Sequence, residues 1–219
     1  LRAMFSANAE LNASYLYPSH DAVFTVTPAE PDNERQRARL AARHTPAYIA
    51  LNVAAETYPG KRLRLATAGA RADALPRQLG HYLSPGGYQG WAIYAEELLV
   101  ERGFGGPPAQ RLHLERQQER CARGYVDVAV HTGALDLAAA GAFLQARGGV
   151  GDPEEALLSI LREPGDWQAQ FGGYLAIKRA AADFLVRRPG ATLLQAHDAI
   201  LGEGMIPPAL LSEVLFEHH

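Results

Sequence analysis

The chain has little of several features that restrict a protein's function. Cys121 is its only cysteine, so it cannot form an internal disulfide, and nothing indicates an oxidising compartment. The formal net charge is only −3 over 219 residues, which argues against a nucleic-acid-binding protein, because such proteins usually carry a strongly basic face. No apolar run approaches the roughly 18 residues that a membrane-spanning helix needs, and no charged and then apolar leader is present. We therefore expect a cytoplasmic protein without a nucleic-acid or membrane partner.

Familiar catalytic motifs are missing as well. The sequence has no glycine-rich phosphate loop between a strand and a helix, no His-Glu-x-x-His, no Cys-x-x-Cys and no Gly-x-Ser-x-Gly. Four histidines have no partner at a useful spacing and are predicted to lie on the surface or in loops: His20, His44, His81 and His113. Isolated motifs therefore do not identify a function.

The composition is that of an ordinary globular protein, with 47% hydrophobic and 21% charged residues. We predict one domain over residues 1–219. The chain starts at Leu1, and residues 1–16 have a loose helical spacing of apolar residues, so we expect a C-terminal portion of a longer protein. A missing N-terminal segment or a second chain would then be a partner. The terminal pair, His218 and His219, is either native or a tag remnant and carries no weight.

Most of the chain is predicted to be helical. The one convincing strand lies within 21–28, where Val23, Phe24 and Val26 precede Pro28. Helices are predicted at 33–44, 46–58, 88–104, 109–131, 135–147, from Asp152 onward, 167–188, 192–204 and 207–216, with a loop at 70–85. The helix from Pro46 is apolar on nearly all sides, so we expect it to be buried. The prediction is a mainly α, multi-helix domain with a short N-terminal strand or hairpin: a strand and loop at 17–30 and a helical core at 33–216.

Four segments together carry residues typical of an active site. They are AAETYPGKRLRL (54–65), YQGWAIYAEELL (88–99), RGYVDVAVHTGAL (123–135) and QAHDAILGEGMIPPALL (195–211). In this order they resemble the C-terminal half of the bacterial "domain of unknown function 885" family, whose members resemble zinc metallopeptidases of the gluzincin type. The resemblance covers roughly residues 17–216, and it implies a metallopeptidase-like fold with extra length on the N-terminal side.

The resemblance also implies a zinc site. The first family motif reads His-Glu-x-x-Pro-Gly-His-His, in which the first histidine and the one after Pro-Gly hold zinc and the glutamate is the general base. The second reads Glu-Gly-Trp-Ala-x-Tyr-Ala-Glu, and its first glutamate is the third ligand. A catalytic zinc ion needs three protein ligands and one open position for the water that it activates.

This sequence departs from the family at each of those ligands. Ala55, Lys61 and Gln89 stand at the three positions, and Arg62 replaces the last histidine of the first motif. The motif residues that are kept are Glu56, Pro59, Gly60, Gly90, Trp91, Tyr94 and Glu96. Alanine has no donor atom, lysine is a protonated ammonium, and glutamine is a weak neutral ligand. We therefore expect no metal ion of the family type and no resident cofactor.

Loss of the metal leaves the Glu56 carboxylate without its counter-charge. A buried, unpaired carboxylate is costly, so one prediction is an ion pair between Glu56 and either Lys61 or Arg62. The alternative is that Lys61, Arg62 and Arg64 form a solvated helix face, which is the usual fate of a run of like charges.

The third segment places Arg123, Asp127 and His131 four residues apart, and thus on one face of a helix. The resemblance implies that this helix lines the cleft and that the arginine and histidine bind substrate or an oxyanion. The alternative is a local Arg–Asp ion pair and a locally oriented histidine. In the fourth segment, His197 and Asp198 match a family His-Asp pair.

A tyrosine of the family, a candidate proton donor, aligns with Gln170 here. Tyr174, one turn later, is the remaining candidate for that role. Together with Tyr88, Trp91 and Tyr125, it is otherwise a core or cleft aromatic. The candidate catalytic residues are therefore Glu56, Arg123, His131 and Tyr174, and the candidate binding residues are Lys61, Arg62, Gln89, Trp91, Asp127 and His197.

Three functions fit these residues. The first is a metallopeptidase-like domain that has lost its zinc site and binds a small molecule or peptide in the cleft. The second is a metal-independent cyclase, isomerase or lyase that uses Glu56 as acid and base on a small metabolite. The third is an active zinc hydrolase with other ligands, such as His131 and His197. Zinc peptidase activity of the family type is not expected.

Overall fold

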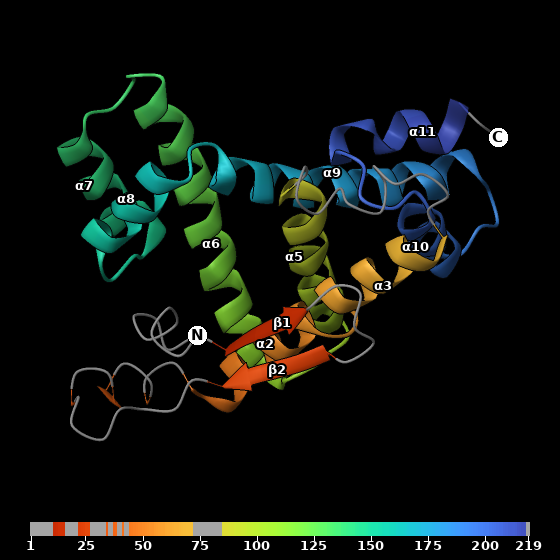
Figure 1. The fold of residues 1–219 in the computed structure, drawn as a ribbon, viewed down its shortest axis with the longest axis horizontal. Helices are drawn as coiled ribbons and strands as arrows, with labels where there is room; N and C mark the ends of the chain where they lie inside the picture. The colour runs from red at the N-terminus through yellow and green to blue at the C-terminus, as the bar shows by residue number, and fades with distance from the viewer. Residues whose placement is uncertain are drawn as a thin grey trace.

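Helices make up most of the fold (Figure 1), as the sequence predicts. The computed structural model describes residues 11–15, 22–26, 34, 37–38, 41, 44–71 and 85–217. Its elements are β1 (Leu11–Tyr15), β2 (Ala22–Val26), α2 (Pro46–Glu56), α3 (Lys61–Arg71), α5 (Pro85–Glu101), α6 (Gly106–His131), α7 (Leu137–Gly148), α8 (Pro153–Arg162), α9 (Asp166–Arg187), α10 (Leu193–Gly202), the 3-10 turn η2 (Pro208–Leu210) and α11 (Leu211–Glu217).

The long helix α9 crosses the molecule and connects its two ends (Figure 1). At one end, α7 and α8 pack against α6, and at the other end α10 and α11 pack against α9. Helix α5 crosses α9 between these ends, and α2 and α3 lie beside α5. Residues 54–65 and 195–211 are thereby brought to the same side of the molecule, because α3 packs against α10.

The two strands form an antiparallel hairpin, in which Ala13 lies opposite Phe24. The strand predicted within 21–28 is confirmed as β2. The helical prediction for residues 1–16 is wrong for 11–15, which form β1. A loose spacing of apolar residues is a weak indication of a helix, whereas the sequence LNASY alternates apolar and polar residues with the period of a strand.

The predicted helix starts follow from their capping residues. Thr45 Oγ1 accepts a hydrogen bond from the Tyr48 backbone N–H ahead of α2, and Asp152 caps α8 at the Glu155 N–H. The expected burial of α2 on nearly all sides is wrong, because the side chains of Ile49 and Val53 are exposed. The predicted cap at 32–33 and most of the loop predicted at 70–85 lie outside the described residues. The loop prediction is wrong at 70–71, which end α3, and at 85, which begins α5.

Glycines allow α5 and α9 to pack backbone against backbone. A Cβ atom on Gly173 of α9 would lie 2.2 Å from the carbonyl oxygen of Gly86, and one on Gly90 of α5 would lie 2.5 Å from the Tyr174 nitrogen. Real Cβ atoms do not approach other heavy atoms so closely, so only glycine fits at this crossing.

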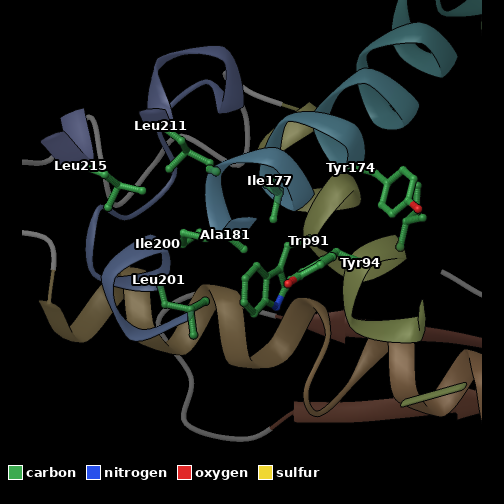
Figure 2. Packing of buried hydrophobic residues seen from close by; sticks show 11 residues of the cluster. Trp91, Tyr94, Tyr174, Ile177, Ala181, Ile200, Leu201, Leu211 and Leu215 are labelled. Carbon is green, nitrogen blue, oxygen red and sulfur yellow. The ribbon is translucent and has the colours of Figure 1, made fainter. Parts of the chain in front are cut away.

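The main apolar cluster lies where α10 and α11 meet this crossing (Figure 2). Trp91 of α5 and Ile177 of α9 contribute to it, together with Ile200 of α10 and Leu211 at the start of α11. A second cluster holds α6, α7 and α8 together and contains Leu144. The main cluster therefore fixes the positions of α5 and α10, which carry the candidate site residues Trp91 and His197.

The crossing predicts a large effect of one added methyl group. Alanine normally stabilises an exposed helix interior relative to glycine by about 0.5–1 kcal/mol. In Gly173→Ala the methyl group meets the α5 backbone, which cannot move aside, so we expect a loss of about 3 kcal/mol or more in the free energy of unfolding. Urea denaturation measures it.

Gly172→Ala is the matched control, because a Cβ there meets only the end of the flexible Gln168 side chain, at 3.3 Å. This variant should be neutral or slightly stabilised. Equal effects of the two substitutions would contradict the close crossing.

Candidate functional site

The turn between α2 and α3 places Glu56 against Lys61. The Gly60 N–H donates to the Ala54 carbonyl oxygen (3.0 Å), and a Cβ on Gly60 would lie 1.9 Å from the Ala55 oxygen. Only glycine fits this tight return of the chain, which brings Lys61 Nζ to 2.6 Å from Glu56 Oε1. The predicted ion pair is confirmed, and the side chains of Lys61 and Glu56 are 12% and 18% exposed, respectively.

Lys61 also lies over an aromatic ring, with Nζ 5.3 Å from the centre of Tyr88 on α5. Gln89 and Arg62 are partly buried at the starts of α5 and α3. The interpretation of Lys61 and Arg64 as a solvated face is therefore wrong. A helix places residues 61 and 64 on one side, and that side faces the body of the molecule.

Arg64 is fully buried. Its Nη1 donates to the Ile200 carbonyl oxygen of α10 (2.8 Å), and its guanidinium carbon lies 5.7 Å from the centre of the Trp91 ring. Burial lowers the pKa of Arg64 to about 10, although the charge of Glu203 opposes the shift. Arg64 is still a cation at neutral pH, and it connects α3 to α10.

Trp91, Tyr94 and His197 form an aromatic group beside the same turn. Trp91 Nε1 donates to the Pro59 carbonyl oxygen (2.9 Å), and His197 Nε2 lies 2.9 Å from the Tyr94 hydroxyl. The three rings meet edge to face, with centres 5.5 to 5.8 Å apart. The structure therefore brings Lys61, Trp91 and His197, from three separate sequence segments, to one region.

The environment holds the Tyr94–His197 pair neutral. Burial, and then the charges of Glu97 and Glu101, raise the pKa of Tyr94 to about 12. Burial, reinforced by Arg102 and opposed by Asp198, lowers the pKa of His197. At neutral pH the hydrogen bond therefore joins a neutral Tyr94 hydroxyl and an uncharged imidazole, and the tautomer of His197 sets which of the two donates.

Tyr174 lies on α9, and its hydroxyl is already engaged. It donates to Glu97 Oε1 (2.9 Å), which also accepts a hydrogen bond from Lys178 Nζ (2.9 Å). Burial and the hydrogen bond to Glu97 raise the pKa of Tyr174. A role as proton donor would require the Tyr174 hydroxyl to leave Glu97.

The third segment is built around Asp127. Its buried carboxylate accepts hydrogen bonds from the backbone N–H groups of Gly165 (2.8 Å) and Gln168 (3.2 Å), which begin α9. His131 Nδ1 lies 3.1 Å from the same carboxylate. Asp127 therefore caps α9 from α6, a role that sequence analysis did not assign.

Arg123 does not pair with Asp127, so the local ion pair considered from the sequence is wrong. Arg123 Nη2 lies 2.7 Å from Glu119 Oε1, and the guanidinium stacks 4.5 Å from the centre of the Trp167 ring. His131 ends α6 beside α7 and α8, whereas His197 lies on α10 at the opposite end (Figure 1). The two histidines of the third function are therefore not brought together.

Sequence analysis missed a buried charge cluster around Glu96. The carboxylate of this fully buried residue accepts hydrogen bonds from His113 Nδ1 (2.8 Å), Arg116 (3.0 Å) and Arg120 (3.2 Å). Arg116 also donates to Asn52 Oδ1 of α2 (2.9 Å). The expectation of a surface His113 is wrong, because it considered partners along the sequence only. The spacing of 113, 116 and 120 on one helix face was the available signal.

Opposing effects act on the pKa of Glu96. Burial alone would raise it, but the charges of Arg120 and Arg116 and the hydrogen bond from His113 outweigh burial and lower the pKa from an ordinary 4.5 to about 2. Glu96 is therefore ionised at neutral pH. In the parts of the chain that the structure describes, no three side chains of His, Cys, Asp or Glu are grouped so that they could hold a metal ion.

Comparison with known proteins identifies the family. The model of the family described as "Bacterial protein of unknown function (DUF885)" matches residues 3–215, so the chain belongs to this family. No curated protein matches the chain. Among the described helices, none is long and apolar enough to cross a membrane.

Two solved structures share the fold. A lipoprotein candidate of unknown function from Shewanella oneidensis has a TM-score of 0.83 and 16% identity, over 94% of this chain and 39% of that one. A lipoprotein candidate from Colwellia psychrerythraea has a TM-score of 0.67 and 23% identity, over 75% of this chain and 29% of that one. This chain therefore spans well under half the length of either structure.

The Glu96 cluster predicts a pH-dependent contribution to stability. The pKa of Glu96 is lower in the folded state, so its contribution is fully present above about pH 4.5 and is lost as the pH falls toward 2. Glu96→Gln should therefore lower the free energy of unfolding by roughly 3 kcal/mol at pH 7, and the difference from wild type should shrink below pH 4.5. Denaturant unfolding between pH 7 and 2 measures this. Glu115→Gln, at an exposed position of α6, is the control. If the loss of unfolding free energy in Glu96→Gln did not change with pH, the lowered pKa of Glu96 would be contradicted.

The Asp127 cap predicts a large loss of stability when its carboxylate is removed. Asp127→Ala leaves buried N–H groups of α9 without an acceptor and should cost about 3 kcal/mol in the free energy of unfolding. Asp136 caps α7 at the surface, through the Ala139 N–H (2.7 Å), so Asp136→Ala should cost about 1 kcal/mol. Thermal denaturation compares the two variants. A smaller loss for Asp127→Ala than for Asp136→Ala would contradict the capping role.

Proposed function

We propose that this chain is a metallopeptidase-like domain that has lost its zinc site and acts as a non-catalytic binding module. The observation that carries the proposal is the ion pair of 2.6 Å between Lys61 and Glu56. Lys61 stands where the resemblance implies a zinc-binding histidine, and Glu56 stands where it implies the general base. An ammonium group on this carboxylate neutralises it without a metal ion.

The charge balance supports the same proposal. In the zinc site that the resemblance implies, a dication is balanced by two carboxylates, the base and the glutamate ligand, and the two histidines are neutral. Here Gln89 removes one of the negative charges and Lys61 supplies one positive charge for Glu56. The family site with its zinc ion and the residues at the same positions here therefore both have zero net charge, which favours a coordinated replacement of the metal by lysine over independent loss of each ligand.

A small molecule or a peptide is the proposed ligand. Partly exposed groups of different chemistry meet beside the α2–α3 turn: the Glu56–Lys61 pair, the Tyr88 ring and the His197 imidazole. Aromatic faces supply contact area and the polar groups supply orientation, a combination typical of ligand sites.

A metal-independent enzyme is the second candidate, and the Tyr94–His197 pair favours it. Its environment raises one pKa and lowers the other, as in many acid–base pairs of active sites. Incubation of the protein with a metabolite extract, followed by mass spectrometry, tests it. Consumption of a metabolite by wild type but not by His197→Gln would favour the enzyme over the binding module.

The cellular location is a further proposal. The cytoplasmic location expected from the sequence competes with export and lipid anchoring, which the descriptions of the two solved relatives favour. Fractionation of cells that express the full-length protein decides between them: recovery with the membrane fraction, and release by detergent, would contradict a cytoplasmic location.

Restoring the three ligands tests the proposed loss of zinc. The triple variant Ala55→His, Lys61→His, Gln89→Glu should bind on the order of one zinc ion per chain, whereas wild type should bind none under the same conditions. Titration with zinc in a calorimeter, with elemental analysis after gel filtration, measures this.

The double variant Ala55→His, Lys61→His is the matched control, because it lacks the carboxylate ligand and should bind zinc more weakly. Stoichiometric zinc on wild type would overturn the proposed function. A folded triple variant that binds no zinc would show that these positions do not form a metal site in this fold.

A further inference from the structure

Arg64 is a fully buried cation that uses only part of its hydrogen-bonding capacity. Nη1 donates to the Ile200 carbonyl oxygen (2.8 Å), but Nε and Nη2 have no hydrogen-bond partner among the residues that the structure describes. In the described part of the chain no carboxylate forms an ion pair with it, and Glu203 contributes only an attraction between charges. A neutral carbonyl group does not balance a full positive charge, so among the described residues the guanidinium has no carboxylate in direct contact with it.

The two unused donors lie on the same edge of the guanidinium. In arginine the Nε–H and one N–H of Nη2 point in nearly parallel directions, away from the Cδ atom. A planar group with two oxygen atoms, above all a carboxylate, accepts both hydrogen bonds at once. The contact with Ile200 uses Nη1, on the other edge. The edge that binds carboxylates best is thus the one that the fold leaves without a partner.

The surroundings of Arg64 indicate the kind of carboxylate. Trp91 and Ile200, which both contact Arg64, belong to the main apolar cluster. In such surroundings hydrogen bonds between charged groups are strong, because water does not compete. An apolar group attached to the carboxylate would be stabilised there, whereas a doubly charged phosphate would lose more hydration energy.

We propose that the unused edge of Arg64 binds the carboxylate of a ligand with an apolar substituent, between α3 and α10. This inference rests on the proposed function as a binding module and names the class of its ligand. Lys61, one turn earlier on α3, is already neutralised by Glu56, so Arg64 supplies the positive charge for the ligand. Both donors of Arg64 are shielded from solvent, so binding requires the groups that cover this edge to move aside.

Titration with butyrate tests the proposal on the whole chain labelled with [15N]arginine. Chloride is exchanged for butyrate at constant ionic strength, and the Nε–H resonances are followed by NMR. We expect one Nε–H signal to shift in a saturable way, and the melting temperature to rise along the same binding curve. Inorganic phosphate, as a second probe, should produce neither effect.

Variants assign the signal. Arg64→Lys keeps the charge without the two-donor edge, so it should lose the response to butyrate. Arg64→Met should also lose it, and it should be at least as stable as wild type without butyrate, because it removes a buried charge that lacks a counter-ion. Arg162→Met, at an exposed position of α8, is the control and should respond like wild type.

Several results would overturn the inference. These are the absence of a saturable shift in wild type, an equal response to phosphate, or an ordered internal water that occupies both donors in a crystal grown with butyrate. The NMR titration of wild type needs no variant, so misfolding of a variant does not remove the test. Zinc binding by the restored triple variant is independent of butyrate, so failure of this inference is distinguishable from failure of the proposed function.

Discussion

The backbone-to-backbone crossing of α5 and α9 is the constraint on which the other features of the fold depend. Gly90 and Gly173 let the two helix axes approach more closely than any side chain would permit. The crossing places Trp91 beside the α2–α3 turn and directs the rest of α9 toward α10 and α11. Because backbones set this distance, the positions of the aromatic side chains depend little on their own packing.

The buried carboxylates of Glu96 and Asp127 find their hydrogen-bond donors in two different ways. Glu96 has positive side chains around it, whereas Asp127 has the backbone N–H groups at the start of α9. The first arrangement connects α5 to α6, the next helix along the chain, and the second connects α6 to α9. Glu56 follows the first way in a smaller and partly exposed form, with Lys61 as its partner.

Local features were predictable from the sequence, and contacts between distant segments were not. The helix starts at Pro46 and Asp152 depend on residues within one turn, and the Glu56–Lys61 pair spans five positions. The hydrogen bond from Arg64 to Ile200 joins residues 136 positions apart, and no pattern near residue 64 indicates it. For this reason the sequence alone leaves a solvated helix face open as an interpretation of Lys61, Arg62 and Arg64.

The same limit applies to Gly90 and His113, whose roles depend on distant segments of the chain. Glycine in a helix usually indicates weak helix propensity, so the role of Gly90 in the crossing becomes visible only when α9 is in place. His113 lies 17 residues from its partner Glu96, on a different helix. A histidine with no partner along its own helix is thus a poor indication of exposure, because its partner can come from any helix that packs against it.

Arg64 differs from the described buried carboxylates in one physical respect. Glu96 and Asp127 each have a complete set of donors, whereas Arg64 is equally buried and has two donors without an acceptor. A fold that satisfies these buried carboxylates but not this cation carries an energetic cost at Arg64. That position lies on the first turn of α3, which also supplies Lys61, and against Trp91, which hydrogen-bonds to the turn. The unsatisfied charge and the altered zinc motif therefore belong to one region, so a function that replaced metal chemistry is expected to use both.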